Sequence, residues 1–262
     1  MDNLNVGLVQ FSPSDDAADN RAVLREAFEH LDDVDLVVLP EYSAWFHKDT
    51  AHWQDGAEPI DGPFVTFVVE QSRELSATIL AGLLVSNGDT ITNTVVAVNA
   101  NGVIGRYDKV HLYDAFGALE SAVVTAGDPT ESPLIVDVND WAVGVQTCYD
   151  LRFPEMSRRL VDAGATVLAV PADWVPGSHK SEHWQTLLRA RAIENVAWVV
   201  AANHAESSGI GESMVIDPLG EVIIEASTGE IVLDVVLDPD AVLAARRSNP
   251  ALRNRRYGVT PL

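Results

Sequence analysis

The chain has 262 residues, of which 47% are apolar and 21% are charged, a balance typical of a folded globular protein and unlike that of a disordered one. Its net charge of -22 argues against nucleic-acid and anionic-membrane partners, because like charges repel. We expect one domain over residues 1–262, since sandwiches and barrels of this length often fold as one unit.

The single cysteine, Cys148, rules out an intramolecular disulfide and favours the reducing cytoplasm. The first residues contain no basic stretch followed by a long apolar one, so we expect no signal peptide. No apolar run approaches the length of a membrane span. We therefore expect a cytoplasmic protein that has no membrane partner.

The first half of the chain alternates short β-branched runs with segments of helical spacing. The apolar residues of Asn20–Leu31 recur on one helical face, and Pro63–Leu75 is a second predicted helix. Asn101-Gly102 predicts a tight turn before the last strand of this half. The predicted strands are Leu4–Phe11, Val34–Pro40, Thr78–Val85, Thr90–Asn99 and Val103–Tyr107.

The second half repeats this order of elements. Helices are predicted over Pro154–Ala163, where proline suits the first turn, and over Glu182–Asn195. The repeated order indicates an α/β fold with an internal pseudo-duplication, in which two sheets pack face to face and helices cover both outer faces. The predicted strands are Leu134–Val138, Trp141–Thr147, Thr166–Pro171, Ala197–Asn203, Ser213–Asp217, Glu221–Glu225 and Ile231–Leu237.

Three chemically distinct side chains lie at the ends of predicted strands. Glu41 opens a long irregular loop over residues 41–62, Lys109 lies at the start of another over residues 108–133, and Cys148 follows a strand directly. Long loops in compact domains are usually functional, and ligands of α/β sheets gather at the carboxyl ends of strands. A carboxylate base, a cation and a thiol are the groups that acyl transfer by covalent catalysis requires.

Each of these residues, taken alone, would more often have a purely structural role. Cys148 would be a small buried hydrophobic residue, and Glu41 and Lys109 would be surface charges. In the catalytic interpretation, the helix beginning near Pro154 lowers the pKa of the Cys148 thiol through its dipole. The backbone N–H of Tyr149 and the Lys109 ammonium then face a developing oxyanion, and Glu41 acts as general base.

The local sequence around these residues resembles the nitrilase superfamily of carbon–nitrogen hydrolases. The resemblance extends over essentially the whole chain. The matching segments are Leu39–Glu41, Tyr107–Leu112, Cys148–Glu155 and Leu188–Asn195.

The resemblance implies a four-layer α-β-β-α sandwich and a Glu41–Lys109–Cys148 triad, with Glu120 at the auxiliary glutamate position of the family. It also implies a homodimer or larger homo-oligomer and no cofactor. From the residues alone, Glu120 could hydrogen-bond Lys109, help to place the substrate, or be a surface charge.

The segment after Cys148 is most similar to the amidase branch that includes omega-amidases and deaminated-glutathione amidases. Tyr149 and Asp150 stand where true nitrilases carry tryptophan and glutamate, so nitrile hydrolysis is not expected. The implied substrate is a small amide that bears a carboxylate, for which Arg152 is a candidate clamp. A structural ion pair of Arg152 with Asp150 or Glu155 is an equal alternative.

Several interpretations stay open from the sequence. Trp174, His111 and Tyr113 could shape the substrate pocket or serve only in packing. His179 and His183 have the spacing of metal ligands, but no second cysteine and no HExxH pattern accompanies them, so we expect no metal site. A carbamoylase on the same triad and a non-catalytic scaffold are the alternative functions. Five arginines near the C-terminus predict either a basic patch or pairing with an acidic surface.

Overall fold

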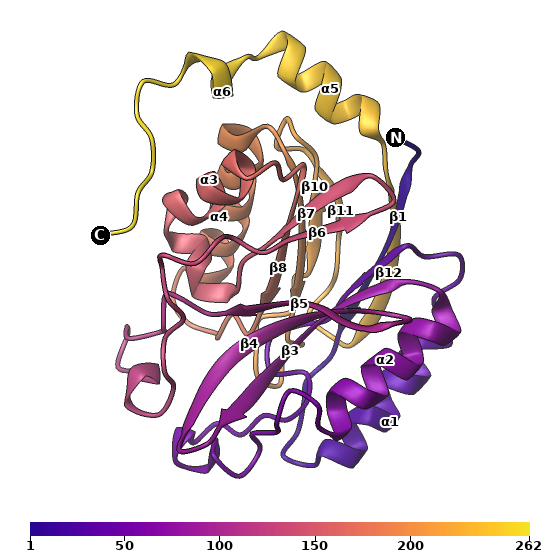
Figure 1. Ribbon diagram of the computed structural model, residues 1–262, viewed down its shortest axis with the longest axis vertical. Helices are drawn as coiled ribbons and strands as arrows, with labels where there is room; N and C mark the ends of the chain where they lie inside the picture. The colour runs from indigo at the N-terminus through magenta and orange to yellow at the C-terminus, as the bar shows by residue number, and fades with distance from the viewer.

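The computed structural model describes residues 1–262 and contains two six-stranded sheets that pack face to face (Figure 1). In the first sheet, β1 runs parallel to β2 and β2 parallel to β3, while the other neighbouring pairs are antiparallel. The strands in spatial order are β12 (Ile231–Leu237), β1 (Leu4–Gln10), β2 (Leu36–Val38), β3 (Thr78–Asn87), β4 (Thr90–Asn99) and β5 (Gly102–Asp108).

The second sheet repeats the arrangement of the first. Its three central strands, β7, β8 and β9, are parallel, and antiparallel strands flank them on both sides. The order in space is β11 (Val222–Glu225), β10 (Met214–Ile216), β9 (Trp198–Asn203), β8 (Val167–Ala172), β7 (Trp141–Val145) and β6 (Ile135–Val138). The pseudo-duplication predicted from the order of elements is therefore confirmed.

Helices form the two outer layers, so the predicted α-β-β-α sandwich is also confirmed (Figure 1). The pair α1 (Ala17–Phe28) and α2 (Pro63–Leu75) covers the first sheet, while α3 (Pro154–Asp162) and α4 (Lys180–Asn195) cover the second. Alternation along each strand assigns its side chains to two different layers. Leu36 and Val38 of β2 face the second sheet, whereas Val37 between them packs in the layer under α1 and α2.

The starts of two helices differ from those predicted, and α1 and α3 end three residues and one residue earlier than predicted. Helix α1 begins three residues before Asn20, because the Asp16 carboxylate accepts hydrogen bonds from the N–H groups of Ala18 and Asp19, at 2.9 and 3.1 Å, and so caps an earlier turn. Helix α4 begins at Lys180, two residues before the predicted start.

The C-terminal helices α5 (Pro239–Ser248) and α6 (Ala251–Asn254) were not predicted. Their arginines do not form one free basic patch, because Arg255 pairs with Asp162 and Arg246 donates to the carbonyls of Val196 and Ala165. None of the helices has both the length and the apolar character that crossing a membrane would need.

Candidate active site

Glu41 lies just beyond the carboxyl end of β2 and is 1% exposed. One carboxylate oxygen, Oε1, accepts hydrogen bonds from Lys109 Nζ at 2.9 Å and Asn93 Nδ2 at 2.6 Å. The other, Oε2, accepts the backbone N–H of Asp173 at 2.8 Å. Gly82 of β3 makes room for this segment, since a Cβ there would lie 2.7 Å from the Glu41 Cα. The carboxylate is thus held in one orientation by donors from three other strands or strand ends.

Lys109 immediately follows β5 and is only 2% exposed. Its Nζ bridges two carboxylates, with Glu41 Oε1 and Glu120 Oε2 each at 2.9 Å. Burial alone would lower the pKa of Lys109, but the charges of Glu120 and Glu41 outweigh burial and raise it well above its usual value. The ammonium is therefore a fixed positive charge in the site.

Glu120 belongs to the short 3₁₀ helix η2 (Glu120–Ala122) within the second long loop. Its Oε1 accepts hydrogen bonds from Tyr42 Oη and Asn93 Nδ2, both at 2.9 Å, and its Oε2 accepts the Tyr113 N–H at 2.6 Å. Burial raises the pKa of Glu120, but the Lys109 charge and these donors outweigh it, so the pKa lies below its usual value. Of the alternatives left open for Glu120, the structure shows the hydrogen bond to Lys109.

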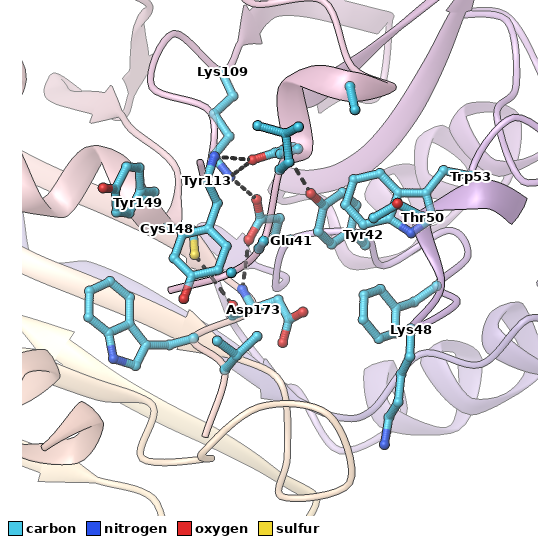
Figure 2. Close-up of a pocket in the computed structure, with 18 of the residues that line it drawn as sticks. Glu41, Tyr42, Lys48, Thr50, Trp53, Lys109, Tyr113, Cys148, Tyr149 and Asp173 are labelled. Carbon is cyan, nitrogen blue, oxygen red and sulfur yellow. Dashed lines mark hydrogen bonds and ion pairs between the residues drawn. The ribbon is translucent and has the colours of Figure 1, made fainter. Parts of the chain in front are cut away.

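Cys148 begins the 3₁₀ helix η3 (Cys148–Arg152) just after β7, and its φ of 44° lies in the left-handed region. The Sγ donates to the backbone carbonyl of Asp173 at 3.4 Å, while the N–H of the same residue binds Glu41. The backbone of Asp173, which follows β8, thus binds the Cys148 thiol through its carbonyl and the Glu41 carboxylate through its N–H (Figure 2).

The expected lowering of the Cys148 pKa is wrong. The side chain is 6% exposed, and burial together with the nearby Glu41 charge raises the pKa of the thiol well above its usual value, although Lys109 acts in the opposite direction. The resting thiol is therefore protonated and needs a base before it can attack.

Asp150 joins the loop of Lys109 to the turn of Cys148. Its fully buried carboxylate accepts hydrogen bonds from Tyr107 Oη at 2.7 Å, from the Thr147 N–H at 2.9 Å and from the His111 N–H at 3.2 Å. Because this carboxylate already has these partners, it does not pair with Arg152. Through its hydrogen bond to Asp150 and its ring stacking, His111 holds the loop that follows Lys109 in place, and it does not line the pocket.

Arg152 has no ion pair with Asp150 or with Glu155, so the structural alternative predicted for it is wrong. Its guanidinium lies 4.7 Å from the ring centroid of Trp174 and 5.6 Å from that of Phe116. The buried Nε and one terminal nitrogen, Nη2, have no hydrogen-bond partner. The donors of this cation are therefore free for a ligand.

One cavity of about 480 Å³, to which both long loops contribute, is lined by Glu41, Lys109, Glu120, Cys148 and Arg152. In Figure 2, Glu41, Lys109 and Cys148 point toward one another, Tyr149 lies on one side of them, and Lys48 and Trp53 lie on the other. Tyr113, Tyr149, Arg152 and Trp174 are also part of the wall, so these four predicted residues do line the pocket.

Sequence reasoning missed several residues of the site. Asp173 follows the end of β8, so the rule that placed Glu41 and Cys148 could also have placed it. Asn93 is an asparagine among the mainly β-branched residues of β4, and asparagine is disfavoured inside strands, which is a signal of function. His204 gave no signal, yet its Nε2 donates to the backbone carbonyl of Glu41 and its Nδ1 lies 3.3 Å from Asp173 Oδ1. His179 and His183 stack with ring centroids 6.2 Å apart, and no group of three potential ligands surrounds them.

Comparison with known proteins agrees with this architecture. Residues 5–247 match the carbon–nitrogen hydrolase family. A deaminated glutathione amidase of Escherichia coli O157:H7 is 38% identical over 235 residues, which cover 88% of each chain. A 2-oxoglutaramate amidase of Paenarthrobacter nicotinovorans is 31% identical over 264 residues, covering 96% of this chain and 88% of the relative.

Among solved structures, XC1258 of Xanthomonas campestris, a CN-hydrolase superfamily protein with an arsenic adduct in its active site, superposes with a TM-score of 0.90 and 32% identity over the full length of both chains. The resemblance drawn from the sequence is thereby confirmed. The chain belongs to the carbon–nitrogen hydrolase family and is an amidase-type hydrolase of that family.

Proposed function

We propose that the chain is a thiol amidohydrolase that cleaves the carbon–nitrogen bond of a small carboxylate-bearing amide through a Cys148 thioester and releases ammonia. The observation that carries this proposal is the interlocked arrangement of three buried groups. Glu41 binds Lys109 directly, and both Glu41 and Cys148 are fixed to the backbone of Asp173. A base, a cation and a nucleophile thus face one cavity.

In the first step, Glu41 takes the Cys148 proton as Sγ forms a bond to the amide carbonyl carbon. The raised pKa of the thiol is the reason that base and nucleophile act together. The carbonyl π electrons move to oxygen, and the Lys109 ammonium and the Tyr149 N–H stabilise the resulting oxyanion. Glu120 acts as a positioning residue, because it binds Lys109 Nζ as a second carboxylate beside Glu41.

In the second step, Glu41 gives its proton to the amide nitrogen, the carbon–nitrogen bond breaks, and ammonia leaves. The acyl group remains on Sγ as a thioester. Glu41 then accepts a proton from water as the water oxygen attacks the thioester carbonyl, and the acid departs while the thiol regains its proton. One difficult hydrolysis is thereby divided into two steps that use the same base.

Arg152 supplies the preference for a carboxylate in the substrate. Its unpartnered nitrogens suit the bidentate geometry of a carboxylate, and Trp174 and Tyr149 complete the wall beside it. The two named relatives, which act on deaminated glutathione and on 2-oxoglutaramate, are consistent with such a substrate. An N-carbamoyl amino acid also carries a carboxylate and is the second candidate.

The proposal includes a cytoplasmic location, where a nucleophilic thiol stays reduced, and a single domain over residues 1–262. It also includes a homodimer. Several apolar side chains of α4 and of the β10–β11 hairpin, namely Ile193, Leu219 and Ile223, are exposed and would be covered by a second subunit. Sedimentation of the purified protein would measure its mass in solution.

Ammonia release tests the proposed reaction. The panel contains omega-amides of keto acids, deaminated glutathione, N-carbamoyl amino acids and a simple nitrile, each incubated with the native protein and with Cys148→Ala. Turnover of a carboxylate-bearing amide that is lost in the variant would support the amidase. Turnover of carbamoyl compounds alone would favour the carbamoylase, and inactivity on the whole panel would favour the scaffold.

A further inference from the structure

The lysines of this chain have an uneven distribution. The sequence contains only three, Lys48, Lys109 and Lys180, and all three line the cavity together with Arg152. A chain with a net charge of -22 therefore concentrates its lysines at one hollow of its surface. Positive charge that is gathered in a cleft attracts and orients anionic ligands.

Lys109 already has two carboxylate partners, but Lys180 has none. Lys180 is the first residue of α4 and is 6% exposed. Its Nζ donates to Tyr113 Oη at 2.9 Å and lies 4.7 Å from the Phe116 ring centroid, so its partners are aromatic residues. Its backbone carbonyl accepts the Trp174 Nε1–H at 2.9 Å, which fixes the lysine to the ring beside Arg152.

None of the acidic residues around the cavity forms an ion pair with Lys180 or Arg152. Glu41 and Glu120 bind Lys109, Asp173 lies beside His204, and Asp49 caps the short helix η1 (Thr50–His52).

Lys180 and Arg152 are thus two neighbouring cations that have no ion pair within the protein, although the charge of Asp173 acts on Lys180. Burial, together with the charge of Arg152, lowers the pKa of Lys180, as expected for neighbouring cations. Leaving such charges unpaired is costly unless a ligand completes the site.

We propose that Lys180 determines substrate specificity: with Arg152 it binds the carboxylate and the adjacent oxygen of a 2-oxo or 2-hydroxy acid amide, and it repels the corresponding 2-amino acid amide. A 2-oxo group offers Lys180 and Tyr113 an acceptor, whereas an ammonium group at the same carbon would face two cations. This inference rests on the proposed amidase for its substrate, but the anion site itself can be tested without turnover.

The first experiment measures alkylation of Cys148, the only cysteine, by anionic iodoacetate and by neutral iodoacetamide. The ratio of the two rate constants isolates the effect of charge, because both reagents form the same carbon–sulfur bond and release iodide. We expect Lys180→Met to lower this ratio about tenfold, the size of one charge-assisted hydrogen bond. Lys180→Arg should keep the ratio, and so should Arg247→Met, which removes an equal charge from the exposed side of α5.

A ratio that Lys180→Met leaves unchanged would overturn the proposal. If that variant does not fold, Lys180→Gln with its near-native volume serves the same comparison. A fall of equal size in Arg247→Met would also overturn it, because the effect would then come from net charge rather than from the cavity.

The second experiment compares kcat/KM for three amides of one carbon skeleton: 4-carbamoyl-2-oxobutanoate, 4-carbamoylbutanoate and glutamine. We expect the 2-oxo compound to be preferred and glutamine to be poorest, and Lys180→Met to reduce the 2-oxo over 2-amino preference about tenfold. An unchanged preference would refute the role in specificity. If all three amides are inert while the alkylation ratio behaves as expected, the proposed amidase fails and the anion site stands.

Discussion

Replacing Lys109 with methionine tests the electrostatic arrangement at the centre of the site. The substitution keeps most of the side-chain volume but removes the one cation that lies 2.9 Å from both Glu41 and Glu120. Both carboxylates are nearly inaccessible to water, so neither can be neutralised by solvent. Breaking a buried ion pair on one side costs about 3–5 kcal/mol.

Urea unfolding measures this loss. With a slope of about 2–3 kcal/mol per molar urea, the midpoint at neutral pH should fall by about 1–2 M. The loss should shrink as the pH falls. In the native protein the lowered pKa of Glu120 means that stability is lost on acidification, whereas in the variant a buried carboxylate can bind a proton and relieve the repulsion.

The double variant Lys109→Met with Glu120→Gln is the control, because it removes one of the two charges that Lys109 balances. It should recover part of the lost stability. A loss of less than about 1 kcal/mol, the range of an exposed ion pair, would refute the reasoning. So would a loss that is equal at about pH 8 and about pH 5.5.

Further predictions concern the nucleophile, the base and the strand that supports them. Cys148→Ala should reduce turnover by about a thousandfold or more, measured as ammonia release. Burial raises the pKa of the Cys148 thiol, so as the pH rises the thiol loses its proton in the unfolded chain before it does so in the native protein. Above about pH 9 the native protein should therefore lose stability relative to Cys148→Ala, by up to about 1.4 kcal/mol per pH unit. Glu41→Gln should reduce amide turnover, measured as ammonia release, by about a hundredfold or more at neutral pH, and turnover equal to that of the native protein would exclude Glu41 as the base. Gly82→Ala should lower kcat by about a hundredfold by displacing Glu41, whereas Gly229→Ala, whose added Cβ meets nothing within 4 Å, should leave it unchanged.

The order of elements could be predicted from the sequence, and most of their boundaries to within two residues. Pro63–Leu75, Thr90–Asn99 and Ile231–Leu237 begin and end where the pattern placed them. Periodicity and turn residues act locally, so a single sequence carries them. The same patterns could not assign β12 to the first sheet, because its pairing with β1 joins residues more than two hundred positions apart.

Only part of the candidate site could be predicted from the sequence. The sequence by itself placed Glu41, Lys109 and Cys148 at the ends of strands, and their catalytic roles remain predictions. Only the tertiary structure determined that Asp173 joins the base to the thiol and that Asp150 is already occupied, leaving Arg152 without an acidic partner.

The direction of the thiol pKa also depended on the fold. A local rule based on the following helix predicted a lowered value, but burial among residues from several strands dominates. Desolvation and charge pairing depend on every neighbour in space, and the charged groups that act on Cys148, Glu41 and Lys109, are distant from it in sequence. The sequence thus determined which chemical groups are present and which strands carry them, while the packing of the two sheets decided their partners and their charge.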